Sequence, residues 1–222
     1  MGYARAALAV DSLIYGTRPP AGDAEGTLFL LHGGAADEHN LEPLADALDR
    51  EQRLAVFLPR GPLALPPGGA HWYTLRHVGY PDRDTFSATY ERLAGWVDAV
   101  LKEVGVAPER AVFGGFSQGA VMSYALGLGA GRPRPAAILA LSGFIPRVDG
   151  FELDLESRAR LPVSISHGTN DSLITVAFGR KARDRLAAAN LDVRYREDPV
   201  GHSISPAAIV QASDTLADAL GA

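Results

Sequence analysis

The stretch Gly115-Phe116-Ser117-Gln118-Gly119 decides the fold of this chain. Its pattern, G-x-S-x-G, is typical of a serine on a sharp turn between a strand and a helix. The preceding residues 111–114 (AVFG) are apolar, as in a buried strand, and residues 118–128 (QGAVMSYALGL) predict an apolar helix. Glycines on both sides of the serine let the backbone turn tightly and adopt strained dihedral angles. The alternative is a serine that only caps the helix.

Length, charge and cysteine content narrow the classes of protein that fit. The chain has 222 residues, 47% of them apolar, enough for the core of one α/β domain. A formal net charge of -5 argues against nonspecific binding of nucleic acid or anionic membranes. The absence of cysteine excludes disulfides, thiol nucleophiles and thiolate metal sites. The N-terminal apolar run is too short to span a membrane and lacks a convincing signal-peptide pattern. We therefore expect a cytoplasmic protein without stable membrane association.

Strands and helices alternate along the chain. This alternation predicts an α/β fold with a mostly parallel central sheet flanked by helices on both faces, in a single domain of residues 1–222. The predicted strands are 27–31, 54–58, 111–114, 136–141, 161–166 and 193–195, with one or two edge strands within 5–15. The predicted helices are 40–48, 85–104, 118–128, 176–189 and 206–220. The proline-rich segment 60–84 is a long loop, in which Trp72 and Tyr73 argue against disorder.

Three residues suited to nucleophilic catalysis each follow a predicted strand. In open α/β sheets, ligands bind beyond the carboxyl ends of the strands. Ser117, Asp171 and His202 occur there, in the order Ser, Asp, His. Serine is a weak nucleophile that needs an adjacent base, so we assign His202 as the base and Asp171 as the group that orients it.

Other histidines and acids compete for these roles. His32 and His167 each end a predicted strand and are alternative bases, although such residues more often fix loop backbone. Asp192 and Asp198 are alternative acids, but Asp192 precedes its strand and Asp198 lies too close to His202 in sequence to come from a separate strand end. The remaining histidines are expected to be ordinary loop or surface residues: His39, His71 and His77.

Backbone amides are the expected oxyanion donors. One is the N–H of Gln118, which follows the serine, and the other is the N–H of Gly34, in the glycine-rich turn after strand 27–31. A plain tight turn at His32-Gly33-Gly34 is the alternative for that turn. There is no H-E-x-x-H motif and no Walker loop, so we expect neither a metal site nor a cofactor.

Taken together, the motifs resemble those of the phospholipase/carboxylesterase family of small α/β hydrolases, which includes the acyl-protein thioesterases. The resemblance runs from about residue 27 to the end. It rests on five stretches: Leu31-His32-Gly33, Gly114–Ala120, Leu141-Ser142-Gly143-Phe144, His167-Gly168-Thr169-Asn170-Asp171 and Gly201-His202-Ser203-Ile204-Ser205. By similarity, Ser117, Asp171 and His202 match the family triad, and Gly34 and Gln118 match its oxyanion donors. The family implies hydrolysis of esters or thioesters without a cofactor, often by dimers.

These features predict a serine carboxylesterase acting on small-molecule esters with short to medium acyl chains. The segment 144–161 is too short for a large cap domain, so the site should be open. Six apolar residues are expected in the pocket wall: Leu65, Trp72, Phe144, Ile145, Leu173 and Ile204. The alternatives are an acyl-protein thioesterase, a lysophospholipase and, more remotely, a noncatalytic binding protein with this fold.

Overall fold

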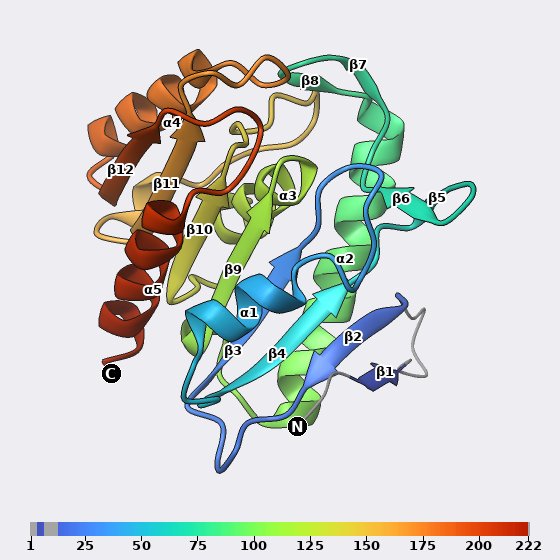
Figure 1. The fold of residues 1–222 in the computed structure, drawn as a ribbon, viewed down its shortest axis with the longest axis vertical. Coiled ribbons are helices and arrows are strands. Elements are labelled where there is room, and N and C mark those ends of the chain that lie inside the picture. Colours follow the sequence, from blue (N-terminus) through green and yellow to red (C-terminus); the bar gives the residue numbers. More distant parts are fainter. Residues whose placement is uncertain (1–3, 7–12, 222) are drawn as a thin grey trace.

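The computed structural model describes residues 4–6 and 13–221. Within this part of the chain, eight strands form one sheet in the order β1-β2-β4-β3-β9-β10-β11-β12 (Figure 1). Their bounds are β1 Ala4–Ala6, β2 Tyr15–Arg18, β3 Gly26–Leu31, β4 Leu54–Pro59, β9 Ala111–Phe116, β10 Ala137–Leu141, β11 Pro162–Gly168 and β12 Asp192–Asp198. β1 and β2 pair antiparallel at the edge, and every pairing from β4 to β12 is parallel. The predicted mostly parallel sheet is confirmed.

Helices cover both faces of this sheet. The described residues contain five α-helices: α1 Glu42–Leu48, α2 Arg83–Val104, α3 Gln118–Leu128, α4 Val176–Ala188 and α5 Pro206–Leu220. Figure 1 shows α1 and α5 in front of the sheet and α2 and α3 behind it. Short 3-10 turns occur at Pro108–Arg110 and Glu156–Arg158. This arrangement is the α/β-hydrolase fold, without a large cap.

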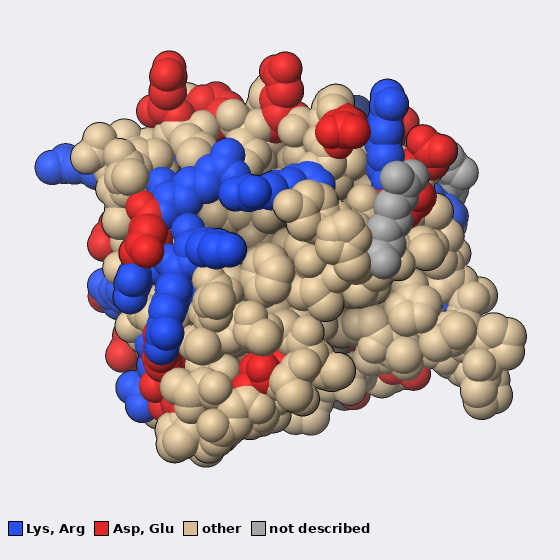
Figure 2. Space-filling view, turned by 90° about the horizontal axis from the view of Figure 1, so that it is seen from above, with Lys and Arg blue, Asp and Glu red and all other residues tan. Residues whose placement is uncertain are grey.

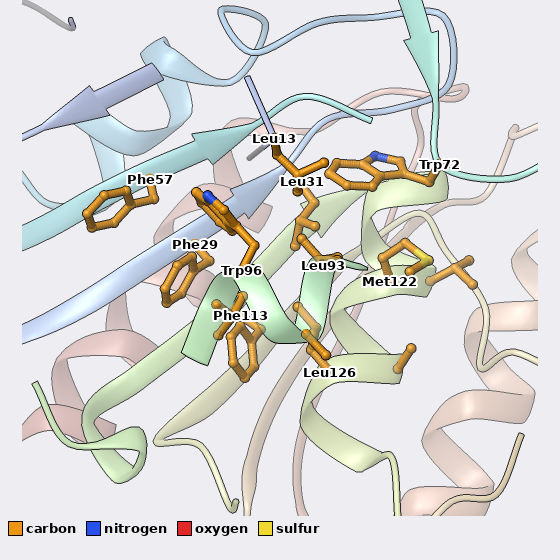
Figure 3. Close-up of a cluster of buried hydrophobic side chains, with 14 of the residues drawn as sticks. Leu13, Phe29, Leu31, Phe57, Trp72, Leu93, Trp96, Phe113, Met122 and Leu126 are labelled. Atoms are coloured by element: carbon orange, nitrogen blue, oxygen red, sulfur yellow. The ribbon is translucent and has the colours of Figure 1, made fainter. Parts of the chain in front are cut away.

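Alternation along the strands divides the core between the two faces. In β3, Leu28 and Leu30 pack in the cluster that includes α1 and α5, whereas Phe29 and Leu31 pack in the cluster that includes α2 and α3. All four side chains are at most 1% exposed. Figure 3 shows the second cluster, where Phe29 and Leu31 meet side chains of α2 and α3. Burying a side chain of this size contributes roughly 1.5–3 kcal/mol, so both faces hold the sheet rigid beneath the site.

The predicted helices are all present, with ends shifted by a few residues. α2 begins at Arg83 because Asp82 caps it, its carboxylate accepting the Thr85 N–H at 3.1 Å. It ends at Val104, and the C-cap Gly105 has a φ of 69°. Strand β12 is longer than expected, because its polar C-terminal half keeps pairing with β11 as far as Asp198. β1 overlaps the start of the predicted edge-strand range 5–15, and residues 7–12 of that range lie outside the described part. β2 begins only at the last residue of that range, so the second edge strand lies later in the chain than expected.

The proline-rich segment after β4 folds into two small hairpins. One pairs β5 (Leu63–Leu65) with β6 (Gly69–His71), and the other pairs β7 (Leu75–His77) with β8 (Tyr80–Pro81). The second lies above the carboxyl ends of the parallel strands (Figure 1). Among the described residues, none of the helices has the length and apolarity that crossing a bilayer requires.

Candidate active site

Ser117 stands at the strained turn between β9 and α3. Its φ is 56° and its ψ is -118°. A positive φ is uncommon for a residue other than glycine, and such strain costs about 1–3 kcal/mol. The Ser117 side chain makes no capping hydrogen bond to α3, so the alternative reading of this serine as a helix cap is wrong.

The two glycines of the elbow are required by close packing. A Cβ on Gly119 would lie 1.9 Å from the carbonyl oxygen of Leu31, and a Cβ on Gly115 would lie 2.4 Å from the carbonyl carbon of Gly119. The Ser117 N–H also donates to the Leu141 carbonyl at 2.9 Å, which ties the turn to the end of β10. The backbone therefore holds Ser117 at the carboxyl edge of β3, β9 and β10.

Asp171 and His202 meet from the loops after β11 and β12. The His202 Nδ1 lies 2.7 Å from Asp171 Oδ2, and the Asp171 side chain is fully buried. The other oxygen, Oδ1, accepts the N–H groups of Leu173 at 2.9 Å and Ile174 at 2.8 Å. Because the carboxylate can only accept when ionised, Nδ1 carries the proton and Nε2 has a lone pair free to take one. Ser117 and His202 line the same cavity.

The two alternative bases are engaged elsewhere. His32 Nε2 accepts the Gly61 N–H at 2.9 Å and its Nδ1 donates to the Gly33 carbonyl at 2.6 Å. His167 Nε2 donates to the Ile174 carbonyl at 2.7 Å. Burial lowers the pKa of both imidazoles below the usual value. Neither lines the cavity at Ser117, so each fixes loop backbone instead.

The alternative acids also lie apart from His202. Asp192 pairs in register with Pro162 at the first residue of β11, far from the carboxyl ends of the strands. Asp198 accepts from Arg196 Nε at 2.8 Å and from the Ser205 hydroxyl at 2.6 Å. Of the three acids, Asp171 is the one hydrogen-bonded to His202.

Gln118 and Gly34 line the same cavity as Ser117. The first N–H groups of a helix have no partner within it, and Gln118 is the first residue of α3. A Cβ on Gly34 would lie 3.2 Å from the Gln118 Cδ and 3.1 Å from the His71 Nδ1. A larger residue at position 34 would therefore press on both neighbours, and glycine keeps the backbone accessible to a bound molecule.

The Gln118 side chain has a structural role that the sequence did not indicate. Its Oε1 accepts the Trp72 N–H at 3.0 Å, and its Nε2 donates to the Tyr73 carbonyl at 3.2 Å. The Trp72 indole N–H donates to the His32 carbonyl at 2.8 Å. The residue after the serine thus fastens the middle loop against the elbow, and this pairing arises only in the tertiary structure.

The cavity has a volume of about 330 Å³ and is mostly apolar. Of the six predicted wall residues, Phe144 and Leu173 line it. The other four do not, and for these the prediction is wrong: Leu65, Trp72, Ile145 and Ile204. Trp72 is fully buried in the core below the cavity. Leu65 lies on the first hairpin, Ile145 faces a neighbouring pocket, and Ile204 packs toward α5.

Several lining residues were missed, among them His71 and Tyr73. The described residues offer no hydrogen-bond partner to the buried His71 Nδ1 or to the Tyr73 hydroxyl. Burial raises the pKa of Tyr73, so its hydroxyl stays protonated and can donate. Both follow β4 in the middle loop, and that position at the carboxyl edge is the signal that could have identified them. Two polar groups without a partner among the described residues thus lie in the wall of the cavity.

Comparison with known proteins gives the family. Residues 16–219 match the Phospholipase/Carboxylesterase family. An acyl-protein thioesterase 1 from Gibberella zeae is 32% identical over 212 residues, covering 85% of this chain and 88% of that protein. One from Cryptococcus neoformans is 29% identical over 172 residues, covering 72% of each.

Solved structures support the fold. A carboxylesterase from Mesorhizobium loti superposes with a TM-score of 0.82 at 22% identity, covering 96% of this chain and 98% of that one. The carboxylesterase of Bacillus cereus gives 0.79 at 24% identity, covering 93% and 94%. With the family match over nearly its whole length and this fold, the chain belongs to the phospholipase/carboxylesterase family of ester-bond hydrolases.

Proposed function

We propose that this protein is a serine carboxylesterase whose nucleophile is Ser117. His202 Nε2 takes the Ser117 proton while Oγ attacks the ester carbonyl, and the tetrahedral oxyanion is held by the N–H groups of Gly34 and Gln118. The alkoxide leaves with the proton from His202, and an acyl-enzyme forms. Water then attacks the acyl-enzyme, giving its proton to His202, and the acid is released as Ser117 recovers the proton.

One observation carries this proposal. The His202–Asp171 pair, 2.7 Å apart, belongs to the same site as a serine held at a φ of 56°. A serine without a base has little nucleophilicity, and a strained turn persists only where the surrounding structure enforces it. Asp171 stabilises the imidazolium formed during the reaction and keeps the reactive tautomer.

The substrate class follows from the cavity. Its lining is mostly apolar, and at its rim Leu173 is 63% exposed and Leu75 is 41% exposed. A space of about 330 Å³ lies at the lower end of the range for small-molecule sites. Short to medium acyl chains suit it. The thioesterase alternative is favoured by the relatives from Gibberella zeae and Cryptococcus neoformans.

Replacement of Ser117 by alanine tests the proposal. Turnover of p-nitrophenyl butyrate is expected to fall to near background, with thermal unfolding unchanged or raised by relief of strain. A variant that keeps most activity would exclude Ser117 as the nucleophile. A series of p-nitrophenyl esters beside an acyl thioester separates the alternatives, since a carboxylesterase should show an optimum at short chains.

Two further expectations stay predictions. A homodimer and a cytoplasmic location follow from the family resemblance and the sequence, and size-exclusion chromatography with light scattering would test the first. A noncatalytic binding protein would fail to react with a fluorophosphonate probe, because an unactivated serine is inert to it.

A further inference from the structure

A second pocket, with a volume of about 150 Å³, adjoins the catalytic cavity. It lies between α4, the loop after β10 and the tip of the β7–β8 hairpin. Its lining combines aromatic or apolar side chains with three cations and contains no carboxylate: Gly79, Tyr80, Phe144, Ile145, Arg147, Phe178, Lys181, Ala182 and Arg185. A pocket of this composition is positively charged in a protein whose formal net charge is -5.

The three cations have no counterion within the described part of the chain. Other arginines of α4 do: Arg180 Nη2 lies 2.7 Å from a Glu197 oxygen, and Arg183 Nε lies 2.7 Å from an Asp184 oxygen. No such ion pair is formed by Arg147, Lys181 or Arg185. Figure 2, looking down on the carboxyl ends of the strands, shows Lys and Arg side chains gathered beside a broad region with few charges.

The spacing on α4 brings the cations together. Lys181 and Arg185 are four residues apart and therefore project from one side of the helix, and both border the pocket. The Lys181 Nζ lies 5.8 Å from the centre of the Phe178 ring. Like charges four residues apart on a helix repel one another. That repulsion is relieved when an anion binds among them, and arginine can hold a carboxylate or phosphate through two hydrogen bonds.

The cationic pocket and the catalytic cavity share one lining residue. Phe144 lines both the catalytic cavity and the cationic pocket. The Phe144 ring packs against the Phe178 ring, and their centres lie 5.5 Å apart. Gly79, with φ of +91°, brings the hairpin so close that a Cβ there would lie 2.8 Å from Phe178. These contacts hold the Phe178 ring between Phe144 and the hairpin.

We propose that the cationic pocket binds a second acidic group, a carboxylate or a phosphate, carried by the ester that Ser117 attacks. The inference rests on the proposed function and names its substrate class: esters with one reactive carbonyl in the apolar cavity and one anion beyond Phe144. Arg147, Lys181 and Arg185 select for that anion without touching the reacting atoms.

Matched substrate pairs test the proposal. The pair that tests for a carboxylate is mono-p-nitrophenyl adipate and its neutral partner, methyl p-nitrophenyl adipate. The pair that tests for a phosphate is 1-octanoylglycerol 3-phosphate and its neutral partner, 1-octanoylglycerol. The double variant Arg147→Gln, Arg185→Gln is compared with Arg180→Gln, Arg183→Gln, which removes the same charge from paired positions. We expect the first to lower kcat/KM for an anionic ester roughly 5- to 20-fold, with less than about 2-fold change for its neutral partner.

The outcomes are separable. A selective loss with the adipate half-ester, the phosphate ester or both supports the pocket and identifies the acid. Equal effects on anionic and neutral partners, or an equal loss in the control double variant, would overturn it. If neither the anionic nor the neutral esters are hydrolysed, the proposed function fails instead. Calorimetry of adipate and inorganic phosphate with Ser117→Ala then tests the pocket without turnover, and binding that the Arg147→Gln, Arg185→Gln pair does not weaken would refute it.

Discussion

Replacement of Asp171 by asparagine should abolish most activity while keeping the fold. The amide oxygen of asparagine can still accept the N–H groups of Leu173 and Ile174, so the loop has no reason to move. The amide NH2 then occupies the place of Oδ2 and donates to His202 Nδ1. That bond selects the opposite tautomer, with the proton on Nε2, which cannot take a proton from Ser117.

The loss of kcat expected in Asp171→Asn has two causes. Loss of a charge-assisted hydrogen bond such as the 2.7 Å His202–Asp171 contact costs about 1.5–3 kcal/mol, or roughly 10- to 150-fold in rate. The wrong tautomer adds to this, and the same substitution in other serine hydrolases lowers kcat by about 10⁴-fold, which corresponds to about 5 kcal/mol. We expect a fall between these limits, close to 10⁴-fold, in kcat for p-nitrophenyl butyrate.

The rival carboxylate provides the control. Asp198→Asn loosens the contacts with Arg196 and Ser205 but leaves the Asp171–His202 pair in place. It should lower the melting temperature and change kcat by less than about threefold. Circular dichroism confirms that both variants are folded. A loss below tenfold in Asp171→Asn, or an equal loss in Asp198→Asn, would refute the assignment of the acid.

Three further predictions concern stability. In His167→Gln, the amide can still donate to the Ile174 carbonyl but does not titrate. Burial lowers the pKa of His167 in the folded state. Its contribution to the free energy of unfolding is therefore complete above the unfolded-state pKa of about 6.5 and declines on acidification, by up to about 1.4 kcal/mol per pH unit. The stability difference between wild type and this variant should therefore shrink from pH 8 to pH 5 in urea titrations, and a constant difference would contradict the burial argument. Gly119→Ala should unfold the protein or cost more than about 3 kcal/mol, because the Cβ would lie 1.9 Å from the Leu31 oxygen. Gly95→Ala in α2 meets nothing within 4 Å and should stabilise by about 0.5–1 kcal/mol, measured by the same titration; destabilisation there would show that the helix does not tolerate a methyl group.

Much of the fold could be predicted because the central strands are short apolar runs with one structural solution. Residues 27–31 are apolar at every position except Thr27, and such a segment must be covered on both faces. The elbow was predictable for a related reason, since glycines on both sides of a serine suit few other turns.

The pocket wall could not be predicted because it depends on which way loop side chains point. Trp72 and Tyr73 are neighbours in the middle loop, yet Trp72 turns into the core and Tyr73 borders the cavity. The backbone of both residues is held by two hydrogen bonds to the Gln118 side chain, one accepted and one donated by it, and Gln118 lies more than forty positions away in sequence. Sequence periodicity does not encode contacts of that kind in an irregular segment.

The cationic pocket could not be predicted from the sequence either. Lys181 and Arg185 fit the helical spacing of an ordinary solvated face, and nothing in the sequence separates them from Arg183, which pairs with Asp184. Only the fold brings Arg147 from another loop to the unpaired members and places Phe144 between them and the serine.

Covalent labelling shows whether Ser117 is an activated nucleophile. The purified protein is treated with a fluorophosphonate and digested, and the modified peptide is identified by mass spectrometry. We expect one adduct per chain, on Ser117, and little labelling in Asp171→Asn over the same time. Absence of an adduct in the wild type, or an adduct on another serine, would contradict this expectation.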